Sequence, residues 1–205
     1  MTVQPVIATM SISLDGIGAG HNQSEERPLG DVGTEILHRW MFETPEESRA
    51  EMDAIVSAGA YVMGRNMFGP IRGEWTGDWR GWWGPNPPYH RPVFVLTHYP
   101  RESLEMDGGT TFHFVTDGIE AALDRARDAA GLMSVHISGG PSTINQYLAA
   151  GLVDELMLQI VPVVAGRGLR LFDGVDGIRL EQISARPVSL ATHLHYRVLG
   201  PLGNA

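Results

Sequence analysis

The order of strand and helix patterns along the chain constrains its fold more than any other feature. Buried-strand patterns alternate with amphipathic helical patterns over the first 150 residues: strands at 6–14, 60–63, 92–97, 111–115 and 133–137, helices at about 34–41, 44–57, 117–130 and 142–150. Strand patterns then follow one another, at 155–164, 169–172, 178–185 and 190–199. Alternation is typical of parallel strands, and consecutive strands pair in antiparallel fashion. The sequence therefore predicts an α/β fold with a central mixed, mostly parallel sheet.

One domain over residues 1–205 is expected, because a chain of 205 residues with 43% hydrophobic content forms one core that folds alone. Residues 69–91 hold four of the five tryptophans among glycines and prolines, without a period of 2 or 3.6. Disordered segments are seldom so aromatic. We therefore predict a long, ordered Trp/Gly/Pro-rich loop there.

The composition excludes several chemistries. The chain has no cysteine, and all 15 of its Lys+Arg residues are arginine. Disulfides, cysteine nucleophiles, thiolate metal sites, lysine Schiff bases and lysine-dependent phosphate loops are therefore absent, and we expect no metal site. Any bound anion must be held by arginine, a hydroxyl or backbone N–H groups.

The net charge of −9 makes nucleic acid and anionic membranes unexpected partners. No basic segment leads into an apolar core at the amino terminus, and no apolar run approaches the ~20 residues of a membrane span. We expect a cytoplasmic protein with a small-molecule substrate.

Two segments, 61–66 and 136–143, have the form strand, glycine turn, helix. A helix start offers unpaired N–H groups and partial positive charge, and glycine lets a phosphate approach the backbone, so the pair suits a dinucleotide. The plainer interpretation makes Gly139-Gly140 a tight turn and Arg65 a surface residue. No GxGxxG pattern follows a strand, so an ordinary Rossmann fingerprint is absent.

Five motifs in order resemble the dihydrofolate reductase-like superfamily over essentially the whole chain. They are Ser13-Leu14-Asp15-Gly16, Val62-Met63-Gly64-Arg65, Phe94-Val95-Leu96-Thr97, Ile137-Ser138-Gly139-Gly140, and Leu152-Val153-Asp154-Glu155-Leu156 followed by Pro162 and Gly166. The branch looks like stand-alone bacterial reductases related to the C-terminal reductase domain of the bifunctional riboflavin biosynthesis deaminase/reductase. The resemblance implies a three-layer α/β/α fold, NADPH bound across the strand ends, hydride transfer to a pterin-like or pyrimidine-like heterocycle, and a homodimer.

The same resemblance implies the cofactor residues. Gly64, Arg65 and Asn66 match the turn at the cofactor phosphates, with Arg65 at the 2′-phosphate. Thr97 and His98 match the strand end at the adenosine. The turn and helix start beneath the pyrophosphate match Ser138, Gly139, Gly140, Pro141, Ser142 and Thr143. The strand and mobile loop beside the nicotinamide match Ser11 and the stretch that includes Asp15, Ile17 and Gly18.

Hydride transfer also requires a proton, from a positioned acid or from ordered water. The region comparable to the first helix of dihydrofolate reductase offers Asp31, Glu35 and His38, and the resemblance does not choose among them. Asp31 could instead cap the helix, and Glu35 and His38 could be solvent neighbours.

The chain departs from the riboflavin-pathway pattern at three places. Ile17 stands where a basic residue is usual, 66–72 replaces an Asp-x-Pro-x-Leu-x-x-Arg stretch, and Ser138 stands where an acidic residue is usual. A phosphoribosyl substrate therefore has weaker support than NADPH. Two alternatives stay open: a 5-amino-6-(5-phosphoribosylamino)uracil reductase of riboflavin biosynthesis, and a non-catalytic nucleotide-binding module. The tryptophans of 69–91 could wall a planar substrate, lie at a subunit contact or pack on the domain's flank.

Overall fold

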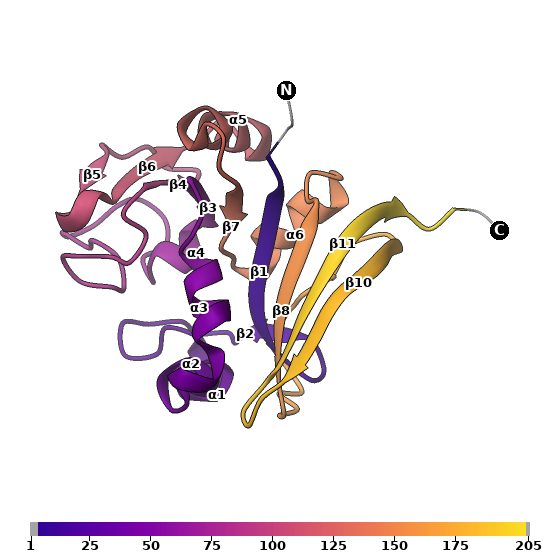
Figure 1. Cartoon of the computed structure of the whole chain (residues 1–205). Coiled ribbons are helices and arrows are strands. Elements are labelled where there is room, and N and C mark those ends of the chain that lie inside the picture. Colours follow the sequence, from indigo (N-terminus) through magenta and orange to yellow (C-terminus); the bar gives the residue numbers. More distant parts are fainter. Residues whose placement is uncertain (1–3, 204–205) are drawn as a thin grey trace.

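A nine-stranded mixed sheet runs through the middle of the molecule (Figure 1). The computed structural model describes residues 4–203, apart from the side chains of Thr34 and Glu35. The strands of this sheet are β1 (Val6–Ser13), β3 (Ala60–Gly64), β4 (Pro92–Leu96), β5 (Leu104–Glu105), β6 (Thr111–Val115), β7 (Val135–Ile137), β8 (Glu155–Val161), β10 (Ile178–Pro187) and β11 (Thr192–Pro201). A separate antiparallel pair consists of β2 (Ile17–Ala19) and β9 (Leu169–Arg170).

The sheet has the order β10-β11-β8-β1-β7-β3-β4-β6-β5. From β8 to β6 every neighbouring pair is parallel. The pairs β8–β11, β11–β10 and β6–β5 are antiparallel. The predicted mixed, mostly parallel sheet is therefore confirmed, and the carboxyl ends of its parallel strands meet along one edge.

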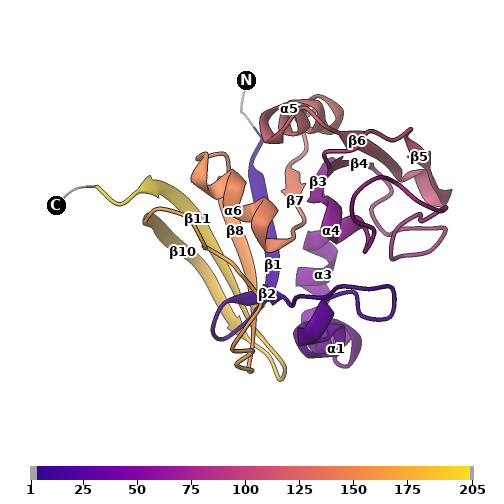
Figure 2. The ribbon, with the colours of Figure 1, turned by 180° about the vertical axis from the view of Figure 1, so that it is seen from behind.

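Helices cover both faces of the sheet, as Figures 1 and 2 show. They are α1 (Thr34–Leu37), α2 (Arg39–Phe42), α3 (Arg49–Ile55), α4 (Arg65–Phe68), α5 (Ile119–Ala130) and α6 (Pro141–Ala149), with 3₁₀ turns η1 (Gly30–Val32), η2 (Pro45–Ser48) and η3 (Asp107–Gly109). Along β3, Ala60 and Val62 join the cluster under α5 and α6, whereas Tyr61 and Met63 join a cluster on the opposite face. The period-2 alternation of the strand thus separates two cores and produces the expected three layers.

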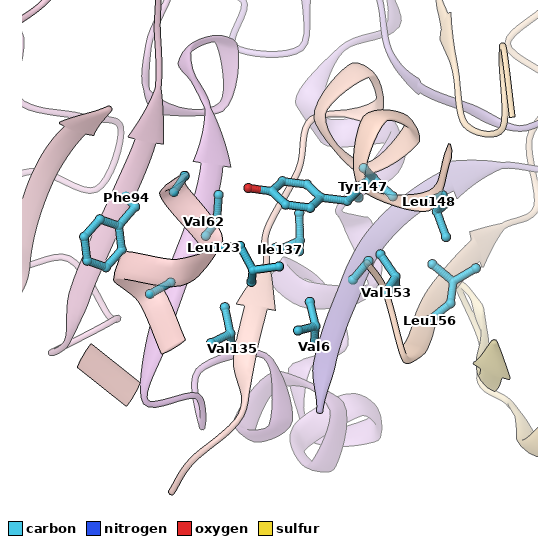
Figure 3. Packing of buried hydrophobic residues seen from close by; sticks show 14 of the residues in the cluster. Val6, Val62, Phe94, Leu123, Val135, Ile137, Tyr147, Leu148, Val153 and Leu156 are labelled. Atoms are coloured by element: carbon cyan, nitrogen blue, oxygen red, sulfur yellow. The ribbon is translucent and has the colours of Figure 1, made fainter. Parts of the chain in front are cut away.

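The larger core lies between the sheet and helices α5 and α6 (Figure 3). Tyr147 of α6 is fully buried, and its hydroxyl donates to the Ile119 carbonyl at 2.7 Å, which ties α6 to the start of α5. Val62, Ile137 and Leu123 pack beside it. Each such side chain contributes roughly 1.5–3 kcal/mol when buried.

The helical boundaries differ from the predicted ones. The helix predicted at 34–41 is two short helices, because His38 has φ −117° and ψ 13°. The one predicted at 44–57 begins as η2 and becomes α3 only at Arg49, and Thr44 makes no capping hydrogen bond. Asp117 does not begin α5. It forms an ion pair with Arg125 at 2.5 Å, and Gly118 at φ 92° is the residue that precedes the helix.

Most strands lie within a few residues of their predicted positions, with three exceptions. The strand predicted at 169–172 ends at Arg170, since Phe172 adopts a positive φ of 71°. Strands β2 and β5 were not predicted, because three and two residues are too few to show a period. Residues 69–91 contain no helix or strand, as predicted. Within the described part of the chain, no helix has the length and apolarity needed to cross a bilayer.

Candidate functional site

A cavity of about 830 Å³ lies at the edge where the parallel strands end. The ends of β3 and β4, the residues after β6 and the start of α6 form one side. Residues of the segment 18–29, which joins β2 to η1, form the other. In open α/β sheets, ligands bind outside the carboxyl ends of the strands, and the volume suits a small-molecule site of roughly 300–1,000 Å³.

Most of the predicted cofactor residues line this cavity. They come from four separate parts of the chain: Gly18, Gly64, Arg65, Asn66, Thr97, His98, Gly140, Pro141, Ser142 and Thr143. Five others do not line it: Ser11, Asp15, Ile17, Ser138 and Gly139. The fold thus gathers both strand–glycine–helix segments around one space.

Glycine allows β3 and α6 to approach each other at the base of the cavity. A Cβ atom on Gly64 would lie 2.2 Å from the Thr143 Oγ1. The Gly64 N–H donates to the Gly139 carbonyl at 2.8 Å, which fastens the two segments together. The Gly139–Gly140 peptide bond is cis. A Cβ on Gly140 would meet no atom within 4 Å, so its backbone faces open space that a ligand can enter.

The amino end of α6 opens on the same cavity. Gly140 is its N-cap, and no side chain among the described residues caps this end. The Gly140 carbonyl accepts hydrogen bonds from Thr143 N–H at 3.0 Å and Ile144 N–H at 3.1 Å. Pro141 has no N–H, so the Ser142 N–H and the partial positive charge of this nine-residue helix are what its uncapped start offers to a phosphate.

Arg65 supplies the positive side chain at the cavity wall. Its Nη1 donates to the Thr97 Oγ1 at 3.4 Å, whereas Nε and Nη2 are buried without a partner. Burial lowers the pKa of Arg65, and the nearby charges of Arg72 and Arg101 lower it further. A buried donor without a partner costs roughly 1–3 kcal/mol, so an anion at this wall would relieve an unfavourable state.

The segment 20–29 is held against α4 by polar contacts. The Gln23 Nε2 donates to the Asn66 carbonyl at 2.8 Å, and Arg72 Nη2 donates to the Gln23 Oε1. Arg72 Nη1 also donates to the Gly69 carbonyl at 3.0 Å. Sequence reasoning predicted Asn66 but missed Gln23 and Arg72, since a polar loop carries no periodic signal and the contacts join distant segments.

Asp15 fastens the turn after β1. Its carboxylate accepts hydrogen bonds from the Ser13 hydroxyl at 2.7 Å, Ala165 N–H at 2.9 Å and Gly166 N–H at 2.8 Å. The Ser13 bond and the two backbone bonds lower the pKa of Asp15 to about 2. Asp15 is therefore ionised at neutral pH and links this turn to the segment after β8.

Ser11 and Ile17 lie in the layer next to the cavity, facing α1 and α2. Ser11 Oγ accepts from Trp40 Nε1 at 3.1 Å and donates to Gln159 Oε1 at 3.4 Å. Ile17 is 1% exposed and belongs to the same apolar cluster as Trp40. The Ser138 hydroxyl is buried without a partner. These residues support the strands and turns that carry the cavity wall.

The proton-transfer candidates lie elsewhere. Asp31 lines a second cavity of about 430 Å³, together with Arg39 and Arg167. Gly20 lines the larger cavity and lies against the Asp31 backbone, since a Cβ added to Gly20 would lie 2.6 Å from the Asp31 nitrogen. Desolvation lowers the pKa of His38 to about 4, so this imidazole is neutral at pH 7. Neither Asp31 nor His38 lines the larger cavity, and the side chain of Glu35 is outside the described residues.

Solved structures share this fold. The bifunctional diaminohydroxyphosphoribosylaminopyrimidine deaminase/5-amino-6-(5-phosphoribosylamino)uracil reductase of Thermotoga maritima is 16% identical with a TM-score of 0.60, over 95% of this chain and 56% of that one. Dihydrofolate reductase of Enterococcus faecalis, solved with NADP(H), is 14% identical with a TM-score of 0.56, over 95% and 96%. These likenesses establish the class: the chain is an α/β protein of dihydrofolate reductase-like fold.

The family follows from the sequence match. The model of the RibD C-terminal domain matches residues 4–194, so the chain belongs to the RibD C-terminal domain family, a family of NADPH-dependent reductases. Among Bacillus subtilis (strain 168) proteins, the uncharacterized YyaP is 25% identical over 191 residues, 90% of this chain and 89% of YyaP. The uncharacterized YwjB is 27% identical over 84 residues, 40% of this chain and about half (48%) of YwjB.

Proposed function

We propose that this protein is an NADPH-dependent reductase that transfers hydride to a small pterin-like or pyrimidine-like heterocycle. The observation that carries the proposal is the pair of buried, unpartnered donors of Arg65 in a cavity that also receives the uncapped start of α6. Arginine holds phosphate as a planar, permanently charged fork. In a chain of net charge −9 this local positive group favours a phosphate-bearing ligand.

The residues of the cavity fit the parts of a dinucleotide phosphate. Arg65, with Thr97 and Arg72 beside it, would hold the 2′-phosphate, and the backbone of Gly140 and Ser142 would hold the pyrophosphate. When bound, the nicotinamide supplies the hydride. The chain's part is to orient the cofactor and to exclude water. Close packing at Gly18 serves both, since a Cβ added there would lie 2.8–2.9 Å from the side chains of Met10 and Pro141.

Burial removes one of the three side chains that the sequence offered as proton donors to the substrate. His38 is neutral at pH 7 because its pKa is about 4, so it can accept but not donate a proton there. Asp31 lies at the neighbouring cavity, where the Asn22 amide donates to its carboxylate at 3.0 Å. Asp31, Glu35 or ordered water remain the donors we propose.

Membership of the RibD C-terminal domain family favours a second candidate, reduction of 5-amino-6-(5-phosphoribosylamino)uracil. Ile17 weighs against a phosphoribosyl substrate, since a buried apolar residue stands where a basic one is usual. Complementation decides the matter: growth of a riboflavin auxotroph that lacks this reductase would support the pathway role, and failure to rescue it would exclude that role.

A non-catalytic nucleotide-binding module is the alternative supported by the position of Asp31 and His38 outside the larger cavity. Stopped-flow oxidation of bound NADPH against a panel of pterins, pyrimidines, flavins and quinones separates the two. Substrate-dependent oxidation on a catalytic timescale supports the reductase. Binding of NADPH without oxidation by any compound of the panel supports the inert module.

We also propose a homodimer formed through the hairpin β10–β11. This hairpin is the edge of the sheet in Figure 1, and it exposes apolar side chains at Leu180, Ile183 and Leu199, which are 36–45% accessible. An exposed strand edge with apolar side chains is a surface that proteins normally cover.

A further inference from the structure

We propose that Trp75 is a positioning residue that holds Arg65 and thereby sets the preference for a nucleotide with a phosphomonoester on its ribose. The proposal rests on the proposed function. It gives a role at the cofactor site to one tryptophan of the Trp/Gly/Pro-rich loop 69–91, whose function the sequence left open.

The contact between the two side chains is direct. The Arg65 Cζ lies 3.7 Å from the centroid of the Trp75 ring, and 5.2 Å from that of Tyr99. A guanidinium over an indole face is attracted by the ring quadrupole, most strongly where water is excluded. Because Nη1 makes only a 3.4 Å bond to Thr97, the indole is the main partner that orients this guanidinium.

Trp75 is itself fixed in place. Its Nε1 donates at 2.8 Å to the carbonyl of Tyr99, the third residue after β4. Its ring packs edge-on against the rings of Phe114 and Phe68, with centroid-to-centroid distances of 5.0 Å and 5.9 Å. The indole therefore transmits the position of β4, β6 and α4 to the Arg65 side chain.

A second arginine contacts the same indole. The Arg101 Cζ lies 4.9 Å from the Trp75 centroid, and the charges of Arg101 and Arg72 act on Arg65. Among the described residues, no carboxylate forms an ion pair with any of these three arginines. The Asp78 carboxylate acts on Arg101, but no described carboxylate acts on Arg65 or Arg72. Like charges held together in this way favour a ligand of high charge density, such as a phosphate dianion.

This arrangement predicts a selective defect. Without the π face, Arg65 keeps its charge but loses its fixed direction, so a ligand that needs a directed fork is weakened more than one that lacks the phosphate. General damage to the cavity would weaken both ligands alike. The ratio of the two affinities therefore separates positioning from mere structural support.

The test is calorimetric titration with 2′,5′-ADP and, separately, 5′-AMP, which differ only in the phosphate on the ribose 2′ position. Trp75→Leu is expected to weaken 2′,5′-ADP binding by about 5- to 30-fold and 5′-AMP binding by less than about 2-fold. Trp75→Phe, which retains a weaker π face, should give a smaller loss in the same direction. Trp83→Leu, on an exposed residue of the same loop, is the matched control and should change neither affinity.

Equal weakening of both nucleotides by Trp75→Phe, or none, would overturn the proposal, and Trp75→Phe carries the test alone if Trp75→Leu does not fold. The proposed function fails separately: then the wild type binds neither 2′,5′-ADP nor NADPH. If the wild type binds 2′,5′-ADP and Arg65→Ala abolishes the preference while both Trp75 variants keep it, only the role of Trp75 is refuted.

Discussion

Substitution of Gly64 by alanine tests how closely β3 and α6 approach at the base of the cavity. The new Cβ would lie 2.2 Å from the Thr143 Oγ1, far inside van der Waals contact. Gly64 has φ −76° and ψ 157°, which alanine adopts freely, so backbone strain plays no part. The cost comes from the overlap alone.

Overpacking of this kind costs about 1–3 kcal/mol, partly offset by roughly 0.4–1 kcal/mol from the less flexible unfolded chain. For a chain of this length each kcal/mol lowers the Tm by about 2–4 °C. Urea denaturation and thermal unfolding followed by circular dichroism measure the loss. Gly203→Ala, in open space near the end of the chain, is the control and should have no effect.

A double-mutant cycle identifies the cause. Thr143→Ala removes the atom that clashes, so it should restore most of the stability of Gly64→Ala, with a coupling free energy of at least about 1 kcal/mol. Purely additive losses, or an unchanged Tm in Gly64→Ala, would refute the close approach of β3 and α6 on which the shape of the site depends.

Three further outcomes follow from the structure. The folded-state pKa of His38 lies below its ordinary value of 6.5, so the stability that comes from burying the neutral imidazole is complete above pH 6.5. It is lost as the pH falls towards 4, by at most about 3 kcal/mol. His38→Gln should therefore flatten the pH dependence of the urea midpoint over this range, and an unaltered pH dependence would contradict the burial of His38. The pKa of Asp15 is lowered to about 2, so Asp15→Asn should reduce the Tm at pH 7. The difference in Tm between variant and wild type should vanish as the pH falls from 3.8 through about 2. A Tm difference that stays constant with pH would count against the hydrogen bonds to Ala165 and Gly166. Ile183→Asp, on the exposed hairpin, should convert the proposed homodimer to monomer in sedimentation velocity, and a dimer that survives would exclude this face.

The sheet could be predicted because its central strands are buried on both faces and appear as short apolar runs, such as 60–63 and 92–97. The helical region after residue 34 could not be bounded, because its breaks depend on distant contacts. Ser48, where α3 separates from η2, bonds the ring of His193, which lies 145 residues further on. Local patterns carry no information on such a partner.

The site divides in the same way. Gly64, Arg65 and Gly140 could be found because glycine turns between a strand and a helix have a chemical signature in the sequence. Gln23 could not, since it acts through a bond to the Asn66 carbonyl far along the chain. The sequence singled out Trp75 with the other tryptophans of 69–91, but the role we propose for it depends on a bond to the distant Tyr99 carbonyl. Loop residues of this kind are positioned by tertiary structure alone.

The most direct test of the central claim is a titration of the unliganded protein with NADPH, followed by nicotinamide fluorescence, beside the same titration with NADH. We expect saturable binding of NADPH, clearly weaker binding of NADH, and loss of this preference in Arg65→Ala but not in Arg49→Ala, which alters an exposed arginine on α3. Absence of saturable NADPH binding, or an Arg65→Ala variant that binds NADPH as the wild type does, would contradict the assignment of this cavity to the cofactor.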